Sequence, residues 1–325
     1  MKKIAIIGAG ATGLFLANFL KCGARVTVFE KSDRVGGRAA SRANEVISFD
    51  HGAQFISVKN EHFENFLLKL IRQRNIAKWE GNFVSIDSIN LITQNMRDKV
   101  RFVGVPSMES IFEFLSEGID LRLHTYIGSA FRQNDKWILG KDPNKNELMF
   151  DWFILAIPPV QASNLLPAEL EWSNILNKLL MLPCISLMAS TKPLRDLPWV
   201  GARITNSPLG WIAFNNTKPR RPSSSAVVAQ SNYYWAKNNF DRVDSELEAV
   251  LVPEMRHILP LETDVIGYEL KKWNYAVVEE PLGEKFLIDK KRCVAVAGDW
   301  CIGQNIEAAF ESAKSLSDKI LNEMI

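Results

Sequence analysis

The stretch that decides the fold is KIAIIGAGATGLFLANFLKCGARVTVFE, residues 3–30. Residues 3–8 form a short apolar run, as expected of a strand buried on both faces of a parallel sheet. A glycine-rich turn follows, then a helical pattern over residues 14–21 and a β-branched run over residues 25–30. Strand, turn, helix and strand within about 30 residues make up one βαβ unit. The sequence therefore predicts a Rossmann-type α/β domain.

The turn carries the pattern G-x-G-x-x-G at residues 8–13. Gly8 permits the tight turn, Gly10 lets a pyrophosphate approach the backbone, and Gly13 lets the helix pack closely on the strand. Glu30 ends the second strand at the place where an acid accepts both hydroxyls of an adenosine ribose. An acid there repels a 2′-phosphate, so FAD or NAD is favoured over NADP. The predicted cofactor contacts in this region are Gly8, Gly10, Ala11, Thr12, Gly13, Glu30 and Lys31.

Two further motifs point to a flavin dinucleotide. In Gly36-Gly37-Arg38 the glycines free the backbone, and Arg38 can neutralise a pyrophosphate with two hydrogen bonds. In Ala297-Gly298-Asp299-Trp300 a strand ends before a helix, so Asp299 can meet a ribityl hydroxyl and the helix N-terminus can face the flavin ring. A plain NAD dehydrogenase leaves both motifs unexplained. The predicted contacts here are Gly37, Arg38, Gly298, Asp299, Asn305 and Ile306.

Charge and composition exclude several classes of protein. Lys and Arg number 39 and Asp and Glu number 37, so the net charge of +2 gives no global field that gathers nucleic acid or acidic lipid. The basic run Lys218-Pro219-Arg220-Arg221 is expected to be a solvated loop. The four cysteines (22, 184, 293, 301) and four histidines (51, 62, 124, 257) lack metal-ligand spacing, so we predict no metal site and no disulfide framework.

The expected location is the cytoplasm, away from membranes. No apolar run reaches the roughly 18 residues that span a bilayer. The N-terminal apolar stretch is broken by Gly8, Gly10 and Gly13, unlike a secretory signal peptide.

The remaining chain divides by pattern. Residues 60–76 and 107–116 are predicted amphipathic helices, and residues 121–157 are strand-like, with turns at Asn134-Asp135 and Asp142-Pro143-Asn144. A buried strand, 152–157, stops at Pro158-Pro159, and another covers 293–297 before a final helix from about 305. We predict a discontinuous cofactor domain (1–55, 99–165, 286–325) and a substrate domain (56–98, 166–285) rich in tryptophan and tyrosine.

The chain resembles the flavin amine oxidase superfamily, and within it the bacterial renalase branch. The general motifs are the glycine fingerprint, Glu30 and Gly36-Gly37-Arg38. The segments that point to renalases are Asp50-His51-Gly52-Ala53-Gln54-Phe55, Gly104-Val105-Pro106-Ser107-Met108 and Gly298-Asp299-Trp300-Cys301; Leu155-Ala156-Ile157-Pro158, Gly303 and Glu307 also fit. The implied fold is α/β, with a Rossmann-type FAD-binding domain of the glutathione-reductase/amine-oxidase kind and an inserted mixed α+β substrate domain.

The resemblance also implies residue roles. Glu30 would bind the adenosine ribose, Arg38 the pyrophosphate and Asp299 the ribityl chain, while Ile127 would meet the adenine side. Gly52, Ala53 and Gln54 would lie against the flavin ring. Cys301 falls outside the segment where covalently linked members attach flavin, so FAD is expected to be non-covalent. Ser312-Ala313 departs from the usual Ser-Gly of such families, which would loosen one packing contact.

The function implied by the resemblance is oxidation of aberrant 2- or 6-dihydro isomers of NAD(P)H to NAD(P)⁺, with electrons passed to O₂ to give H₂O₂. The flavin carries the chemistry, so no catalytic side chain is predicted. The expected substrate pocket contains Gln54, Phe55, Trp211, Asn215 and Trp273, with Lys218 or Arg220 meeting a phosphate. His51 lies in the flavin-side segment, and we interpret it as structural and not as a base.

Other functions stay open. A flavin amine oxidase would show an aromatic cage around the amine, and a desaturase would need a long apolar tunnel. A non-catalytic flavin-binding protein would hold FAD without turnover. The sequence does not decide the oligomeric state or the choice between NAD and NADP forms.

Overall fold

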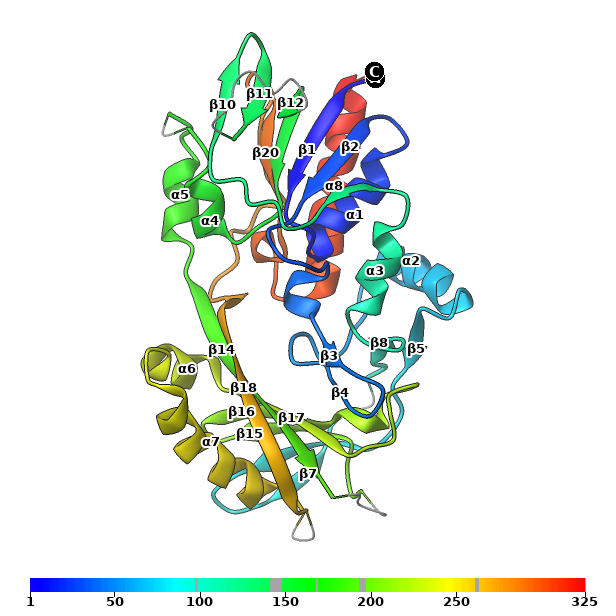
Figure 1. Ribbon diagram of the computed structural model, residues 1–325, viewed down its shortest axis with the longest axis vertical. Helices are drawn as coiled ribbons and strands as arrows, with labels where there is room; N and C mark the ends of the chain where they lie inside the picture. Colours follow the sequence, from blue (N-terminus) through cyan, green and yellow to red (C-terminus); the bar gives the residue numbers. More distant parts are fainter. Residues whose placement is uncertain (97–98, 141–147, 168, 193–196, 261–262, 325) are drawn as a thin grey trace. The chain divides into compact units, whose positions relative to one another are not determined.

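The computed structural model describes residues 1–96, 99–140, 148–167, 169–192, 197–260 and 263–324, which form two compact units (Figure 1). Unit 1 comprises Met1–Arg38, Phe112–Met181 and Val277–Ile325, and unit 2 comprises Ala39–Ile111 and Leu182–Ala276. The two units are defined by contacts within the chain. The domains expected from the sequence are instead defined by what they would bind, a cofactor or a substrate. The domain boundaries after residues 55, 98, 165 and 285 therefore stay a prediction.

Unit 1 is built on a six-stranded sheet in the order β19-β20-β13-β1-β2-β9. The four pairings from β20 to β9 are parallel, and β19 pairs antiparallel with β20. The central strands are buried because their residues are apolar on both faces. The strands are β1 (Lys3–Ile7), β2 (Arg25–Phe29), β9 (Asp120–Arg122), β13 (Trp152–Leu155), β19 (Leu287–Asp289) and β20 (Val294–Val296). The predicted α/β class with a parallel Rossmann-like sheet is confirmed.

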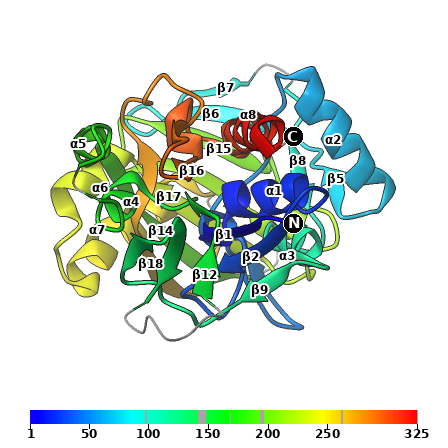
Figure 2. The same cartoon turned by 90° about the horizontal axis from the view of Figure 1, so that it is seen from above.

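Two helices of unit 1, α1 (Ala11–Leu20) and α8 (Ile306–Met324), lie side by side (Figure 2). Phe310 of α8 contacts Phe15 and Phe19 of α1 edge to face, with ring centroids 5.4 and 5.5 Å apart. The shorter helices are α4 (Pro159–Ser163), α5 (Ser173–Lys178) and α3 (Ser110–Ser116), which begins in unit 2. Pro158 and Pro159 follow β13 after two residues and stand at the start of α4, where a missing N–H costs no hydrogen bond.

A three-stranded antiparallel sheet completes unit 1, with strands β10 (Ala130–Gln133), β11 (Lys136–Leu139) and β12 (Met149–Phe150). Asn134 and Asp135 join β10 to β11 with φ of 47° and 58°, as a two-residue hairpin requires. The turn predicted at this pair is confirmed, and the turn predicted at 142–144 lies outside the described residues.

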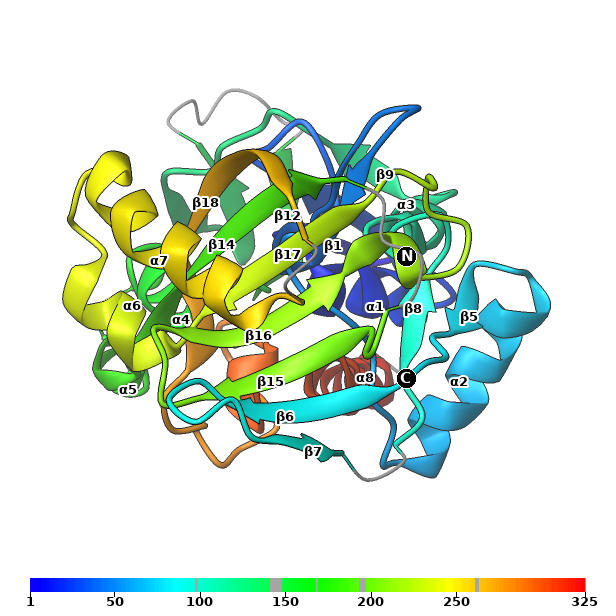
Figure 3. The same ribbon diagram turned by 90° about the horizontal axis from the view of Figure 1, so that it is seen from below.

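Unit 2 is built on a seven-stranded sheet in the order β18-β14-β17-β16-β15-β6-β7 (Figure 3). Its strands are β6 (Phe83–Asp87), β7 (Thr93–Asn95), β14 (Met181–Thr191), β15 (Gly201–Thr205), β16 (Leu209–Phe214), β17 (Ala226–Ser231) and β18 (Val265–Val278). Two small antiparallel pairs accompany it: β3 (Arg42–Ala43) with β4 (Ser48–Phe49), and β5 (Ile76–Lys78) with β8 (Phe102–Gly104).

The core of unit 2 lies between this sheet and α7 (Asp244–Ile258), which packs Leu247, Leu251 and Met255 on the strands. The other helices are α2 (Glu61–Arg72) and α6 (Tyr233–Asn239). Asn60 caps α2 through the N–H of His62, and the helix predicted for 60–76 ends sooner because Arg74 adopts a left-handed φ of 65°.

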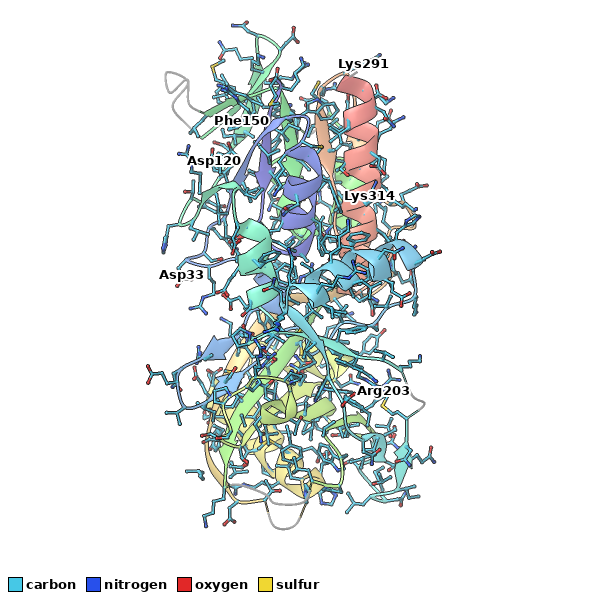
Figure 4. All side chains as sticks on the ribbon, turned by 90° about the vertical axis from the view of Figure 1, so that its right-hand side faces the viewer. Asp33, Asp120, Phe150, Arg203, Lys291 and Lys314 are labelled. Carbon is cyan, nitrogen blue, oxygen red and sulfur yellow. The ribbon has the colours of Figure 1, made fainter. Side chains whose placement is uncertain are left out.

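Charged residues such as Arg203 of β15 and Lys314 of α8 are exposed (Figure 4). Among the described residues, no helix combines the length and the apolar character needed to cross a bilayer.

Candidate functional site

The glycines of the turn between β1 and α1 have two different roles. Gly8 has a φ of 103°, and a Cβ on it would lie 2.7 Å from the carbonyl oxygen of Ala156. A Cβ on Gly13 would lie 1.9 Å from the carbonyl oxygen of Gly8. Gly10 differs, because apart from its chain neighbours no atom of the described residues lies within 4 Å of the place where its Cβ would be. Packing therefore requires Gly8 and Gly13, whereas Gly10 leaves the backbone open to a ligand, as pyrophosphate binding needs.

The N-terminus of α1 adds an electrostatic feature. Gly10 is its N-cap, no side chain caps the helix, and its first turn holds no acidic residue. The N–H groups of Ala11, Thr12 and Gly13 lack intrahelical acceptors because they belong to the first turn. Such a terminus, next to the open face of Gly10, suits the phosphates of a dinucleotide.

The second glycine pair packs on the first. Gly36 forms a parallel β-bridge with Gly10 and donates its N–H to the carbonyl of Ala9 at 2.9 Å. Gly37 has a φ of 52°, and a Cβ there would lie 3.2 Å from the Cα of Gly10. The two motifs, far weaker as separate signals, thus form one continuous glycine-lined backbone surface.

Glu30 is buried and holds the glycine turn in place. Its Oε2 accepts the N–H of Ala9 at 2.9 Å, and its Oε1 accepts the N–H and hydroxyl of Ser32. A carboxylate has about four acceptor positions, so Glu30 retains capacity for a ribose hydroxyl. Lys31 follows it as an exposed residue.

The chain around Ile127 lies beside Glu30. The N–H of Thr125 bonds the carbonyl of Glu30 at 2.8 Å, and the N–H of His124 bonds that of Ser32 at 2.9 Å. Ile127 itself is buried. The structure therefore brings the predicted adenine and ribose contacts of unit 1 together.

Arg38 and Asp299 form a pairing that sequence reasoning missed. Arg38 donates from Nη1 and Nη2 to the two carboxylate oxygens of Asp299, at 2.9 and 2.6 Å. Asp299 is nearly buried, whereas Arg38 keeps a third of its side chain exposed. Each was assigned to a different part of FAD, and no local pattern links residues so far apart.

Gly298, the neighbour of Asp299, is required by packing. A Cβ on it would lie 2.1 Å from the Nε1 of Trp300, whose indole donates to the carbonyl of Ile157. Asn305 precedes Ile306 at the start of α8, and its Oδ1 accepts the N–H of Ala308 at 2.8 Å. The residues of unit 1 together fit a dinucleotide, since they combine an open glycine backbone, a helix N-terminus and a ribose acceptor.

Unit 2 holds a buried charge cluster made of Asp50, Lys218 and Arg221. All three side chains are inaccessible to solvent. Asp50 Oδ2 accepts from Lys218 Nζ at 3.0 Å and Arg221 Nη2 at 2.7 Å, while its Oδ1 accepts from the hydroxyl of Ser41 and the N–H of Met108. The expectation that residues 218–221 form a solvated loop is wrong for Lys218 and Arg221, because these cations compensate a buried carboxylate; Arg220 alone of the three cations is exposed.

The cluster shifts the ionisation of its members. Burial by itself would raise the pKa of Asp50, but the two cations and the donors from Met108 and Ser41 hold that pKa well below its usual range. Burial lowers the pKa of Lys218 to about 8, against the opposing attraction of Asp50. The cluster therefore contains one carboxylate against two cationic groups, and the less firmly ionised group is Lys218.

The segment 51–55 follows Asp50 and is neither helix nor, in the described structure, a strand. The carbonyl of His51 accepts from Ser186 Oγ at 2.7 Å and Trp273 Nε1 at 3.0 Å, and that of Gly52 accepts from Gln230 Nε2 at 2.8 Å. Side chains from three strands thus fix the backbone where Gly52, Ala53 and Gln54 were predicted to meet the flavin ring.

The predicted substrate residues of unit 2 fall into two groups. Phe55 and Trp211 contact each other with ring centroids 5.4 Å apart, and the Trp211 Nε1 is buried without a hydrogen-bond acceptor among the described residues. By contrast, Asn215 is fully buried and bonds the backbone of Ser48 and Asp50, and Trp273 stacks on His51. Trp273 thus holds the segment 51–55 and Asn215 holds the residues just before it, and a substrate contact by either stays a prediction.

Two neighbours of Phe55 were missed from the sequence. Trp79 lies 6.4 Å from the Phe55 ring, and the guanidinium of Arg101 lies over Phe55 and over Phe83, at 5.3 and 3.8 Å from the ring centroids. The sequence gives little reason to select Trp79 or Arg101 as site residues, because the chain contains nine tryptophans. The cluster is a set of flat rings with a cation, which suits a planar ligand.

Of the four cysteines, the two buried ones are not activated as nucleophiles. All four are free thiols, and burial raises the pKa of Cys184 to about 11 and that of Cys301 to about 12. In the described part of the chain, no group of three His, Cys, Asp or Glu side chains is arranged to hold a metal ion.

Comparisons with known proteins concern the fold and the glycine-rich N-terminal part of the chain. The family profile described as NAD(P)-binding Rossmann-like domain matches residues 6–70. The 4,4'-diapophytoene desaturase (4,4'-diaponeurosporene-forming) of Staphylococcus aureus (strain MRSA252) is 37% identical over 119 residues, which cover 36% of this chain and 22% of the desaturase. The same enzyme of Staphylococcus haemolyticus (strain JCSC1435) is 43% identical over 56 residues, 17% of this chain and 11% of that protein. The alignment therefore spans about a fifth or less of either relative.

Solved structures match over the whole chain. A candidate protoporphyrinogen oxidase from Exiguobacterium sp. 255-15 has a TM-score of 0.78 at 13% identity, with 99% of both chains covered. Cyclohexylamine oxidase from Brevibacterium oxydans IH-35A has a TM-score of 0.75 at 12% identity, also with 99% of both chains covered. Reduced UDP-galactopyranose mutase has a TM-score of 0.77 at 12% identity, covering 99% of this chain and 94% of that one. Residues 6–70 thus match an NAD(P)-binding Rossmann-like domain, and the whole chain shares the fold of these two oxidases and of UDP-galactopyranose mutase.

Proposed function

We propose that this chain is an FAD-dependent oxidase that oxidises 2- or 6-dihydro isomers of NAD(P)H to NAD(P)⁺ and uses O₂ as electron acceptor, giving H₂O₂. The observation that carries the FAD assignment is the bridge between Gly10 and Gly36. It joins the nucleotide fingerprint to a second glycine pair that a plain NAD dehydrogenase does not need. The fold shared with oxidases and the partial sequence match to a desaturase support the same assignment.

The residues of unit 1 would hold the dinucleotide. The open backbone at Gly10 and the N-terminus of α1 would bind its phosphates, and Glu30 would accept a ribose hydroxyl. Arg38 and Asp299 would supply a cation to the pyrophosphate and an acceptor to the ribityl chain. When bound, FAD supplies the hydride-accepting chemistry, so the protein needs no strong acid or base.

The substrate assignment rests on the resemblance to renalases, and the rings of unit 2 are compatible with it. Phe55 and Trp211 offer flat apolar surface, and the unpartnered indole N–H of Trp211 can donate to a carbonyl such as a carboxamide oxygen. Arg101 places a cation beside Phe55, which disfavours a cationic ammonium group near that ring.

The test is anaerobic mixing of the flavin-loaded protein with four reductants: 2- and 6-dihydronicotinamide dinucleotides, ordinary NADH and a simple aliphatic amine. We expect rapid loss of the oxidised flavin absorbance with the two isomers, and slow or no loss with NADH and the amine. Admission of air should then regenerate the absorbance and produce H₂O₂. Reduction by the amine alone would overturn the substrate assignment.

A second candidate is a flavin amine oxidase or desaturase, favoured by the fold shared with putrescine oxidase and cyclohexylamine oxidase and by the partial match to a desaturase. In the same panel it predicts reduction by the amine, or by an apolar polyene added in detergent. A non-catalytic flavin-binding protein predicts bound FAD that no member of the panel reduces.

A further inference from the structure

The charge cluster Asp50–Lys218–Arg221 is joined to the segment 51–55 by direct hydrogen bonds. Lys218 Nζ donates to Gln54 Oε1 at 3.3 Å as well as to Asp50. Gln54 Nε2 in turn donates to the carbonyls of Asp50 and Gly52. The carboxylate, the ammonium group and the backbone of the segment therefore form one connected network, which is buried at Asp50, Lys218 and Gln54.

The same carboxylate gathers distant parts of unit 2. Arg221 reaches Asp50 and also donates from Nη1 to the carbonyl of Gly104. Ser41 and Met108 donate to the other carboxylate oxygen. Asp50 therefore serves as the common acceptor for three chain segments, around Ser41, Met108 and Lys218–Arg221, and all of these donors belong to unit 2.

The segment 51–55 depends on this hydrogen-bond network because it is not held by the backbone hydrogen bonds of a helix or a sheet. Residues 51–55 lie outside the helices and strands, and the carbonyls of His51 and Gly52 accept hydrogen bonds from side chains. A buried charge that loses its partner is strongly unfavourable, so the position of Asp50 is tied to that of both cations. Buried hydrogen bonds of this kind make the conformation of an irregular segment well defined.

We propose that Asp50 is a positioning residue which, through Lys218 and Arg221, fixes the backbone of residues 51–55. For the part that concerns flavin and substrate, this inference rests on the proposed function, because Gly52, Ala53, Gln54 and Phe55 are the predicted contacts of unit 2. The geometric part, that Asp50 sets the conformation of the segment, stands on the contacts of unit 2 alone.

The first test is amide hydrogen exchange of the flavin-free protein, wild type and Asp50→Asn. The substitution keeps the shape of the side chain but turns an amide toward two cations. Exchange should rise at least several-fold in peptides that contain residues 50–55, where the N–H of Asp50 bonds Asn215 and that of Gly52 bonds Ala40. Exchange in α7 should stay unchanged. Equal exchange of residues 50–55 in the two proteins would overturn the proposal.

The matched control is Glu254→Gln. Glu254 is a half-buried carboxylate of the same unit that accepts hydrogen bonds from the hydroxyls of Ser88 and Ser207. It controls for the loss of a hydrogen-bonded carboxylate without contact to the segment. We expect it to leave the exchange of residues 50–55 as in wild type.

The second test uses the flavin-loaded protein. Because unit 1 carries the predicted dinucleotide contacts, Asp50→Asn should retain FAD but show a shifted visible flavin spectrum. Its anaerobic reduction by the dihydronicotinamide isomers should fall about 10- to 100-fold, as expected for slight misplacement of reacting groups. Glu254→Gln should keep the wild-type spectrum and rate. A wild-type spectrum and rate in Asp50→Asn would overturn the link from Asp50 to the flavin.

Lys218→Met provides the second variant if Asp50→Asn does not fold. It leaves a neutral Asp50–Arg221 pair but cuts the bond to Gln54, so it should also increase exchange in residues 50–55, by a smaller factor. Unchanged exchange in Lys218→Met would overturn the proposal. A wild-type protein that binds no flavin, with exchange changed in either variant, would refute the proposed function and leave the positioning role standing.

Discussion

Arg38 and Asp299 form a bidentate ion pair across 261 residues of sequence, with nitrogen–oxygen distances of 2.9 and 2.6 Å. The pair joins the second glycine motif to the loop before α8, and both residues belong to unit 1. Arg38 stays a third exposed, so it can bond a further anion without leaving Asp299. The two residues are therefore expected to act on a bound dinucleotide as a coupled pair.

Asp299→Asn is expected to weaken FAD binding by about 1–3 kcal/mol, the usual effect of losing hydrogen bonds between charged groups. The affinity can be measured by titrating the flavin-free protein with FAD and following flavin fluorescence. Asp318→Asn is the control, because Asp318 pairs with Lys314 on the exposed surface of α8, where ion pairs contribute little. An affinity for FAD within two-fold of wild type in Asp299→Asn would contradict the assigned role.

Gly10→Ala and Gly13→Ala should affect different properties, the first mainly FAD affinity and the second the stability of the protein. A Cβ at position 10 meets no atom of the described residues beyond its chain neighbours, so the free energy of unfolding should change by no more than about 1 kcal/mol, while FAD affinity should fall at least ten-fold. A Cβ at position 13 would collide with the carbonyl oxygen of Gly8, so that variant should lose stability even without ligand. Denaturant unfolding and FAD titration of both variants provide the comparison. Full FAD affinity in Gly10→Ala would show that no ligand approaches this turn closely.

The part of the fold that sequence reasoning anticipated is the part set by local pattern. The run 3–8, the glycines and the β-branched run 25–30 became β1, the turn and β2, since each follows from backbone conformation and burial over a few residues. The pairing of β1 with β13, and of β13 with β20, brings together the apolar runs that were recognised one by one.

The charge cluster of unit 2 was missed for the opposite reason. Asp50 and Arg221 are 171 residues apart, and a run with three cations in four residues is typical of solvated loops. Which of its cations are buried depends on tertiary contacts that no local pattern records. The available signal was the position of Asp50 at the head of Asp-His-Gly-Ala-Gln-Phe, which was used for the flavin contacts of its neighbours and not for Asp50 itself.

Glu30→Ala should lower both the affinity for FAD and the stability of the flavin-free protein. The substitution removes the ribose acceptor, which should lower FAD affinity by about 1–3 kcal/mol. It also leaves the N–H groups of Ala9 and Ser32 without their hydrogen-bond acceptor, so the free energy of unfolding without ligand should fall by about 1–3 kcal/mol. Thermal unfolding with and without FAD separates the two effects. Unchanged flavin occupancy would count against adenosine lying beside Glu30.

Lys218→Met should change how stability depends on pH. The pKa of Lys218 is about 8 in the folded protein and near 10.5 when unfolded, because burial disfavours the ammonium form. Between these values the unfolded chain binds more protons than the folded one, so Lys218 should make stability rise with pH there.

The slope is at most about 1.4 kcal/mol per pH unit for one proton. Urea unfolding of wild type and Lys218→Met at about pH 7.5, 9 and 10 would measure it, because this series runs from just below the folded pKa to just below the unfolded one. The difference in unfolding free energy, wild type minus variant, should increase across that series. A constant difference would mean that Lys218 stays charged beside Asp50 throughout, held by the carboxylate more firmly than its burial opposes.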